Sequence, residues 1–265
     1  MSTPTRWLLG LEYLGNQYHG WQRQSHAKSI QGTLESVLST VCDEAIEVTC
    51  AGRTDAGVHA TAQYVHFDCH KERPEKAFLK GVNTLLPNDI SVFHVQKVSE
   101  DFHARFSAQF RTYLYIIHNN PVPRAVSNGR VTHFQYPLDA LLMHEAAQSL
   151  LGEQNFSAFR SAHCQSHSVH RFMREIAVTR EQDLILVKIT ANAFLHHMVR
   201  NIVGSLIEVG QAKQSVEWLS ELLASEDRTI AGATAPSEGL YLVNVEYQEQ
   251  YEIKSEIRNP WLVAL

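Results

Sequence analysis

The chain has 265 residues, a hydrophobic fraction of 44% and a formal net charge of −5, ordinary values for a globular protein with one large or two medium-sized domains. Its first residues lack the basic start and long apolar stretch of a secretory signal, and no apolar run reaches membrane-spanning length, so export and membrane insertion are not expected. The four cysteines form no CxxC pair, which favours reduced thiols in a cytoplasm.

The first hundred residues predict the element order βαββαβ. Alternating apolar residues predict a strand over 6–13, and Ser29 is expected to cap the helix that follows. Strands are expected over 46–51 and 60–69, on either side of a glycine-bounded turn. A helix over 75–86 and the strand ISVFHVQKV complete the order, which is typical of a ferredoxin-like unit.

The second half repeats this order with insertions. RTYLYII predicts a strand, PLDALLMHEAAQSLL a helix that begins at its proline, and MREIAVTR with LILVKITA a hairpin. FLHHMVRNIVGSLIEVG predicts a long helix from Leu195, SVEWLSELLA a shorter one, and LYLVNVEY a closing strand. The expected fold is therefore α+β, with two ferredoxin-like halves over 1–105 and 106–265 whose antiparallel sheets flank a central cleft.

Charge is distributed unevenly along the chain. From Glu208 to Glu256, ten acidic residues face three basic ones, a local balance of −7. No Asp or Glu lies between Phe102 and Leu138. This pattern suits a protein with one basic face for a phosphate backbone, although uneven charge without a function stays open. The arginines of the acid-free stretch are Arg105, Arg111, Arg124 and Arg130.

The segment AGRTDAGVHA places Asp55 in a turn bounded by Gly52 and Gly57. Such turns often hold phosphate through backbone N–H groups, but a carboxylate there would repel an anion. Asp55 is therefore either a catalytic group shown at a sheet end or a residue that caps its own turn. A catalytic carboxylate that must stay ionised needs a cation, and Arg200, at the edge of an apolar helix face, is a candidate; it is otherwise a solvated surface arginine.

RTYLYII places Arg111, Tyr113 and Tyr115 on one face of a strand. Such a face suits an unstacked RNA base, although a half-buried aromatic ladder gives the same pattern. The loop YLGNQYHGWQRQ favours RNA contact over core packing for three more side chains: Tyr18, Trp21 and Arg23.

Histidines occur in two places that need an interpretation. HCQSHSVH has metal-like spacing but no second cluster and no acidic partner, so an RNA-binding loop is favoured and no metal is expected. His196 and His197 are expected to diverge because they are neighbours on a helix. The candidate ligands in the first segment are His163, Cys164, His167 and His170.

Together these motifs resemble the bacterial tRNA pseudouridine synthase A (TruA) family, which modifies uridines in the anticodon stem-loop. The resemblance implies a homodimer without metal or cofactor that isomerises uridine to pseudouridine at positions 38–40 of tRNA. The matching segments, in order, are YLGNQYHGWQRQ, SIQGTLE, AGRTDAGVHA, FHARFSA, RTYLYII, HHMVRNIVG and APSEGLYLV.

The resemblance also implies roles for single residues. Asp55 is the essential catalytic residue, Arg200 its partner, and Tyr113 the ring that stacks on the target base. Arg53 helps to admit or replace the flipped nucleotide, and Leu240 packs in the pocket. The expected substrate-binding set is completed by Arg23, Arg105 and Arg111.

Two other classes stay open from the residues alone. A non-catalytic RNA-binding module would show the same aromatic sheet face. A carboxylate glycosidase would need a second acid near Asp55, and the nearest in sequence, Glu47 and Asp68, are expected in or beside strands.

Overall fold

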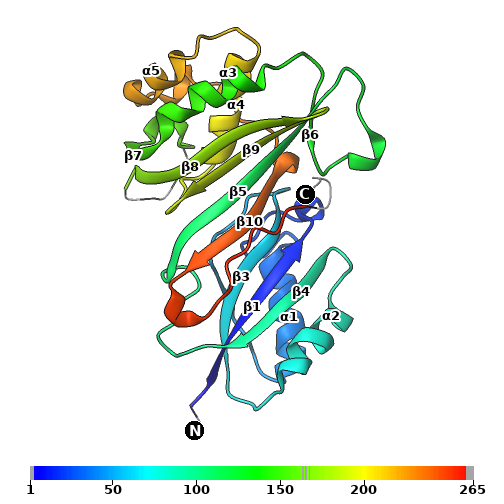
Figure 1. Cartoon of the computed structure of the whole chain (residues 1–265). Helices are drawn as coiled ribbons and strands as arrows, with labels where there is room; N and C mark the ends of the chain where they lie inside the picture. The colour runs from blue at the N-terminus through cyan, green and yellow to red at the C-terminus, as the bar shows by residue number, and fades with distance from the viewer. Residues whose placement is uncertain (1–2, 163, 165, 167, 261–265) are drawn as a thin grey trace. The chain divides into compact units, whose positions relative to one another are not determined.

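The computed structural model describes residues 3–162, 164, 166 and 168–260. The chain forms two compact units, one made of Met1–Gln109 with Tyr241–Leu265 and the other of Phe110–Leu240. Both combine mostly antiparallel strands with few helices (Figure 1), so the expected α+β class is confirmed. None of the helices in the described ranges has the length and hydropathy of a membrane span.

The first unit is built on β3 and its neighbours. β1 (Thr5–Tyr13) lies between β4 (Ile90–Lys97) and β3 (His59–Cys69) and is antiparallel to both. The short β2 (Thr49–Cys50) pairs with β3, so only two residues of the strand expected over 46–51 form. On its other side β3 pairs in parallel with β10 (Leu240–Tyr247).

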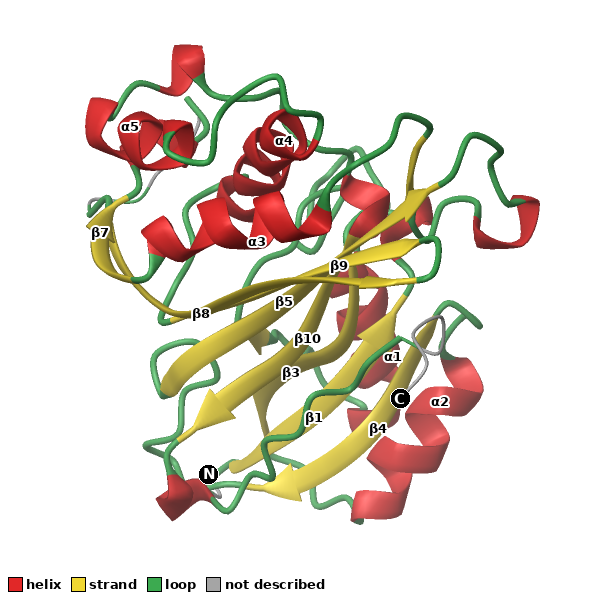
Figure 2. Cartoon of the chain, turned by 45° about the horizontal axis from the view of Figure 1, so that its top comes forward, coloured by secondary structure: helices red, strands yellow, loops and turns green. Residues whose placement is uncertain are grey.

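Two helices lie on the same side of these strands (Figure 2). α1 (Ile30–Cys42) begins as expected, since the Ser29 side chain accepts a hydrogen bond from the Gly32 amide. The helix expected over 75–86 is irregular instead: a π-helical turn, Ala77–Gly81, precedes α2 (Val82–Leu85). The buried residues of this segment are Phe78 and Val82, whereas Leu79 is 38% exposed.

Both faces of the β1–β3 pair are buried, because successive side chains of a strand point to opposite sides. On the helix side, the rings of Trp7 and Phe78 lie 4.7 Å apart, centroid to centroid, and Phe67 also contacts Phe78. On the other side, the ring of Tyr64 lies 5.9 Å from that of Tyr247 on β10. The strand that follows the Asp55 turn is therefore held on both faces.

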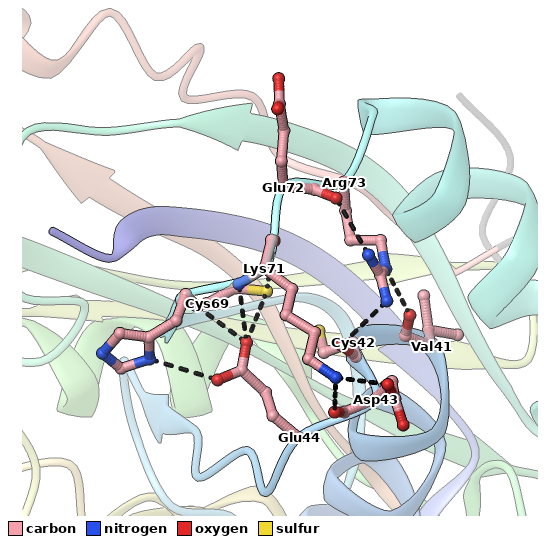
Figure 3. A network of polar contacts seen from close by, with 9 residues as sticks. Val41, Cys42, Asp43, Glu44, Cys69, Lys71, Glu72 and Arg73 are labelled. Carbon is pink, nitrogen blue, oxygen red and sulfur yellow. Dashed lines mark hydrogen bonds and ion pairs between the residues drawn. The ribbon is translucent and has the colours of Figure 1, made fainter. Parts of the chain in front are cut away.

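The far end of β3 is tied to the end of α1 by a polar network (Figure 3). The Glu44 carboxylate accepts hydrogen bonds from the amides of Lys71 and His70, at 3.0 and 2.8 Å, and these bonds, the Lys71 amide first, lower its pKa to about 2. Arg73 donates from Nε to the carbonyl of Val41 at 2.8 Å and so satisfies an acceptor in the last turn of α1.

In the second unit, β9 (Leu184–Ala191) lies between β5 (Ala108–Asn119) and β8 (His170–Glu181), and β8 also pairs with β7 (Gly152–Asn155). All of these pairs are antiparallel. A short β6 (Thr132–Phe134) runs parallel to β5. The expected hairpin is confirmed as β8 and β9.

Helices α3 (Ala140–Ala147) and α4 (Met198–Gly210) pack together on one side of β8 and β9 (Figure 1), and α5 (Trp218–Ser225) follows them. α3 does not begin at Pro137 as expected. Asp139 caps it instead, because its carboxylate accepts hydrogen bonds from two free amides of the first turn. Single 3₁₀ turns lie at Gly15–Gln17, Ala125–Ser127, Gln148–Leu150, Ser157–Phe159, Arg228–Ile230, Ser237–Gly239 and Glu249–Tyr251.

The order expected for the first hundred residues is observed as β1, α1, β2, β3, α2 and β4. β10 completes the first unit, whereas the expected domain 106–265 assigns this strand to the second half. The division of the chain into two ferredoxin-like domains stays a prediction.

Candidate active site

Asp55 lies in a tight turn directly before β3. The amide of Val58 donates to the carbonyl of Asp55 at 3.1 Å, and Gly57, the third residue of this turn, has φ +79°. Glycine adopts this left-handed conformation at little energetic cost, which explains why position 57 is a glycine. The Asp55 side chain is half-buried. The turn is thus a fixed structure that presents one carboxylate at the end of a buried strand.

Groups from two other segments hold the backbone of this turn. The Trp21 amide donates to the carbonyl of Thr54 at 2.9 Å, and the Tyr13 hydroxyl lies 2.8 Å from the Thr54 hydroxyl. On the other side, Gln63 of β3 donates from Nε2 to the carbonyl of Gly52 at 2.6 Å. Asp55 is therefore flanked by residues whose positions are set by the core of the first unit.

The loop before α1 does not present its rings to a ligand, so the expectation of RNA contact is wrong for Tyr18 and Trp21. These side chains are 3% and 1% exposed. The Tyr18 hydroxyl donates to Asp89 at 2.7 Å, and burial raises its pKa. Both rings are therefore core residues.

Arg23, from the same loop, is half exposed and paired with two acids. Its Nη1 lies 2.8 Å from the buried carboxylate of Glu35, and its Nη2 lies 3.3 Å from Glu47. These pairs fix the guanidinium beside α1. Its role in substrate binding stays a prediction.

Two more arginines that are predicted to bind the substrate lie in the first unit. Arg53 and Arg105 are exposed. The guanidinium carbon of Arg105 lies 5.5 Å from the ring centroid of Phe106. Both are placed where a polyanion could reach them.

In the second unit, β5 carries the predicted base-stacking face. The ring of Tyr113 is 8% exposed and meets the edge of Phe194 at 5.0 Å, with the ring planes at 85°. Tyr115 is fully buried, and its hydroxyl bonds to Thr132 and to the carbonyl of Pro236. Burial raises the pKa of Tyr115. Both tyrosines are buried, Tyr115 more completely than Tyr113.

Arg111, two residues before Tyr113 on β5, is 9% exposed and donates from Nη1 to the carbonyl of Asn192 at 2.8 Å. Its guanidinium links β5 to the segment after β9. A contact with RNA stays a prediction for this residue.

Arg200 lies in the first turn of α4 and is half-buried. Its Nε donates to the carbonyl of Ala235 at 2.7 Å, and the Ala235 amide donates back to the carbonyl of Arg200 at 3.1 Å. A Cβ on Gly204, one turn later, would lie 1.7 Å from the carbonyl oxygen of Ala233. The absence of that atom lets the 233–235 segment approach α4 and orient Arg200. Leu240, 5% exposed, follows this segment and begins β10.

The two adjacent histidines correct another expectation. α4 begins at Met198, not at Leu195, and His197 has a left-handed backbone, φ +62°. As a result the rings of His196 and His197 do not diverge as on a helix; their centroids lie 3.9 Å apart. In the HCQSHSVH segment, His163 and His167 lie outside the described residues.

Comparison with known proteins identifies the family. A family model described as tRNA pseudouridine synthase matches residues 11–107 and 146–248, most of the chain. The chain belongs to the tRNA pseudouridine synthase family. The expected family and enzyme class, an RNA pseudouridine synthase, are thereby confirmed. Asp55, Arg200 and Leu240 lie within the matched segments, and Arg111 and Tyr113 lie between them.

Relatives named tRNA pseudouridine synthase A are similar over nearly the whole chain. The relative from Colwellia psychrerythraea is 50% identical over 255 residues, 96% of this chain and 98% of its own. Those from Hydrogenovibrio crunogenus and Haemophilus ducreyi are 54% and 53% identical, over 92% and 97% of this chain and 94% and 98% of theirs. Among solved structures, a Cbf5–Nop10–Gar1 complex matches with 13% identity and a TM-score of 0.32 over 76% of this chain and 45% of that chain.

Sequence reasoning missed several residues that build the site. In the sequence, Gln63 is recognisable only as a polar residue inside an apolar strand. Its hydrogen bond to the Gly52 carbonyl could not be inferred from neighbouring residues. Phe194, which meets Tyr113, was hidden in a segment expected to be helical. Gly20 and Gly204 act through the space they leave, which a sequence pattern does not reveal.

Proposed function

We propose that this enzyme isomerises uridine to pseudouridine in the anticodon stem-loop of tRNA, with Asp55 as its essential catalytic residue. The observation that carries the proposal is the rigid turn that presents Asp55 within a segment matched by the family model. The resemblance supports the anticodon stem-loop as the target.

In the proposed reaction, the N1–C1′ bond of uridine breaks, the base turns while it is held, and C5 bonds to C1′. N1 gains a proton, and the proton on C5 is lost. No water enters the product, so a single carboxylate suffices where a glycosidase uses two. Ionised Asp55 either attacks C1′ or removes the C2′ proton to give a glycal-like intermediate, and both routes stay open.

Other predicted residues support this chemistry in the proposal. The uridine must leave the stem at a cost of a few kcal/mol, and stacking on Tyr113 offsets part of it. Tyr113 is also a candidate to relay the C5 proton. Arg200 keeps Asp55 ionised and oriented, as an electrostatic partner held in place before the substrate binds.

The remaining assignments belong to the same proposal. The resemblance supports Arg53 as a residue that helps to admit or replace the flipped nucleotide and Leu240 as an apolar residue that packs in the pocket. Three arginines bind the RNA. A cytoplasmic homodimer, built from two ferredoxin-like halves with an RNA-binding cleft, is part of this picture. The three arginines are Arg23, Arg105 and Arg111.

Release of tritium from C5 of uridine in unmodified tRNA tests the proposal. The wild type should release tritium, and Asp55→Asn should lose on the order of 10³-fold or more in turnover, because the amide is neither a nucleophile nor a base. Glu75→Gln, which removes an exposed acid of the same unit, should behave as the wild type.

Substantial turnover by Asp55→Asn would remove Asp55 from the chemistry. Binding of tRNA by the wild type without any pseudouridine would instead favour a non-catalytic RNA-binding module.

A further inference from the structure

An exposed phenylalanine lies in the loop between β4 and β5 of the first unit. Phe106 is 76% exposed, more than any other aromatic side chain among the described residues. Its sequence neighbours, Arg105 and Ser107, are polar, so the ring does not belong to a wider apolar patch along its own loop. A single exposed ring is common on protein surfaces, so the groups around Phe106 decide whether it is suited to a ligand.

The loop around Phe106 is fixed in advance. The imidazole Nδ1 of His103 accepts hydrogen bonds from the amides of Arg105 and Phe106, both at 3.2 Å. The Ser107 amide donates to the carbonyl of His103 at 2.8 Å, and the Ser107 hydroxyl accepts from the His103 amide at 3.0 Å. Burial lowers the pKa of His103, which keeps Nδ1 available as an acceptor.

The ring of Phe106 rests on a second ring. Its centroid lies 4.3 Å from that of His103, with the planes 27° apart, so the two rings are stacked. His103 in turn contacts His66 of β3, at 4.8 Å between centroids, and His66 Nδ1 accepts from the Ala104 amide at 3.1 Å. The stack thus begins in the core of the unit and ends in a flat ring at the surface.

The charge beside this ring favours an anionic partner. Arg105 is exposed and lies 5.5 Å from the ring centroid. The nearest acid in sequence, Asp101, is exposed and accepts a hydrogen bond from the Tyr251 hydroxyl at 3.4 Å. No acidic residue follows His103 until after Leu138.

We propose that Phe106 is a stacking site for an unpaired base of the tRNA, other than the uridine that is isomerised. The proposal rests on the proposed function and adds a second point of base contact to it. A flat ring face with a cation beside it matches a nucleobase with its phosphate, since bases of single-stranded loops stack on aromatic side chains and arginine binds the backbone. A protein partner would instead need a broader apolar surface than one ring.

Three variants of the full-length protein test the site by tRNA affinity. Phe106→Ala should raise the Kd for unmodified tRNA by roughly 5- to 100-fold, the range for losing one base–aromatic stack. Phe106→Trp, which keeps a flat ring, should bind as tightly as the wild type. Leu85→Ala, which truncates an apolar side chain 52% exposed in the same unit, should leave the Kd unchanged.

Three results would overturn the assignment: a wild-type Kd for Phe106→Ala, a Kd for Phe106→Trp as weak as that of the alanine variant, or a loss of turnover at saturating tRNA without any loss of affinity. A change of oligomeric state in Phe106→Ala at unchanged tRNA affinity would also overturn it and assign the ring to a contact between copies of the chain. Failure of the proposed function is distinguishable, because it appears as wild-type protein that binds tRNA and forms no pseudouridine.

Discussion

The position of Asp55 depends on a neighbour that has no side chain. Gly20 has φ +87°, and a Cβ at this position would lie 2.8 Å from the carbonyl oxygen of Thr54. The same carbonyl accepts a hydrogen bond from the Trp21 amide, so backbone groups join the loop before α1 to the Asp55 turn. The sequence predicted the glycine-bounded turn correctly, because glycine, aspartate and turn geometry are coupled locally.

The burial of Tyr18 and Trp21 could not be predicted in the same way. A sequence pattern of interleaved aromatic and basic residues is the same whether the residues lie on the surface or in the core. The difference is made by remote partners, such as Asp89 for the Tyr18 hydroxyl, that no local pattern names. The burial of Arg111 has the same origin, since its partner is a backbone carbonyl after β9.

Substitution Gly20→Ala should destabilise the protein by about 1–3 kcal/mol, since the new side chain meets both a left-handed backbone and the Thr54 carbonyl. Gly81→Ala is the matched control. A Cβ there meets nothing within 4 Å in a helical turn, so it should stabilise the protein by about 0.5–1 kcal/mol.

Urea unfolding of the two variants measures both effects. Turnover should fall with Gly20→Ala because the displaced carbonyl precedes Asp55. A Gly20→Ala protein as stable as the wild type would show that the two loops are not held together at this point.

Among the elements, strands and the hairpin were predicted more reliably than the ends of helices. The β8–β9 hairpin was predicted correctly because its two strands are adjacent in sequence. β1 was predicted from the alternating apolar residues Trp7, Leu9 and Leu11, although the residues between them are buried as well. α4 was placed three residues too early, since Leu195 continues its apolar spacing, while the left-handed backbone of His197 keeps the helix from beginning before Met198. Such a conformation leaves no mark on composition.

The loop from 102 to 107 is an element whose stability should depend on pH. His66 accepts the Ala104 amide, and burial first, then the charges of His103 and Arg6, lowers its pKa to about 4, while Asp68 opposes the shift. Between pH 6.5 and pH 4 the unfolded chain binds a proton here that the folded protein does not. The free energy of unfolding should therefore fall as pH drops through this window, by up to about 3 kcal/mol from this group.

Unfolding in urea at several pH values measures this slope. His66→Gln, whose amide oxygen can still accept a hydrogen bond, should have a smaller slope than the wild type, while the exposed His26→Gln should not. Because carboxylates titrate in the same range, only the difference between variants is informative. Equal slopes in all three proteins would exclude His66 as the sensor.

At the scale of the whole molecule, an acidic protein must bind a polyanion. The net charge of −5 hides a stretch from 103 to 137 without acids and a stretch from Glu208 to Glu256 with a balance of −7. Affinity for tRNA should then arise from local basic residues, with counterions released on binding. The sequence alone shows this uneven distribution of charge along the chain, because charged residues can be counted without a structure.

The affinity for tRNA should fall at least about tenfold between about 50 and 200 mM salt, with a linear dependence of log Kd on log salt concentration. Arg105→Gln should lower the magnitude of that slope by roughly 1, the value expected for one lost phosphate contact. Lys213→Gln, from the acidic stretch, where Lys213 lies 3.8 Å from Glu208, should leave the slope unchanged. A slope that is the same in both variants would place Arg105 outside the phosphate contacts.

The parallel pairing of β10 with β3 has a consequence for the order of events during synthesis. The second unit is continuous in sequence, but the unit that carries Asp55 takes its last strand from residues after 240. On the ribosome, the middle of the chain emerges complete while the N-terminal part still lacks its edge partner. The nascent chain therefore finishes the Asp55-bearing unit last, and a truncated product that ends before Leu240 carries the Asp55 turn on an unfinished sheet.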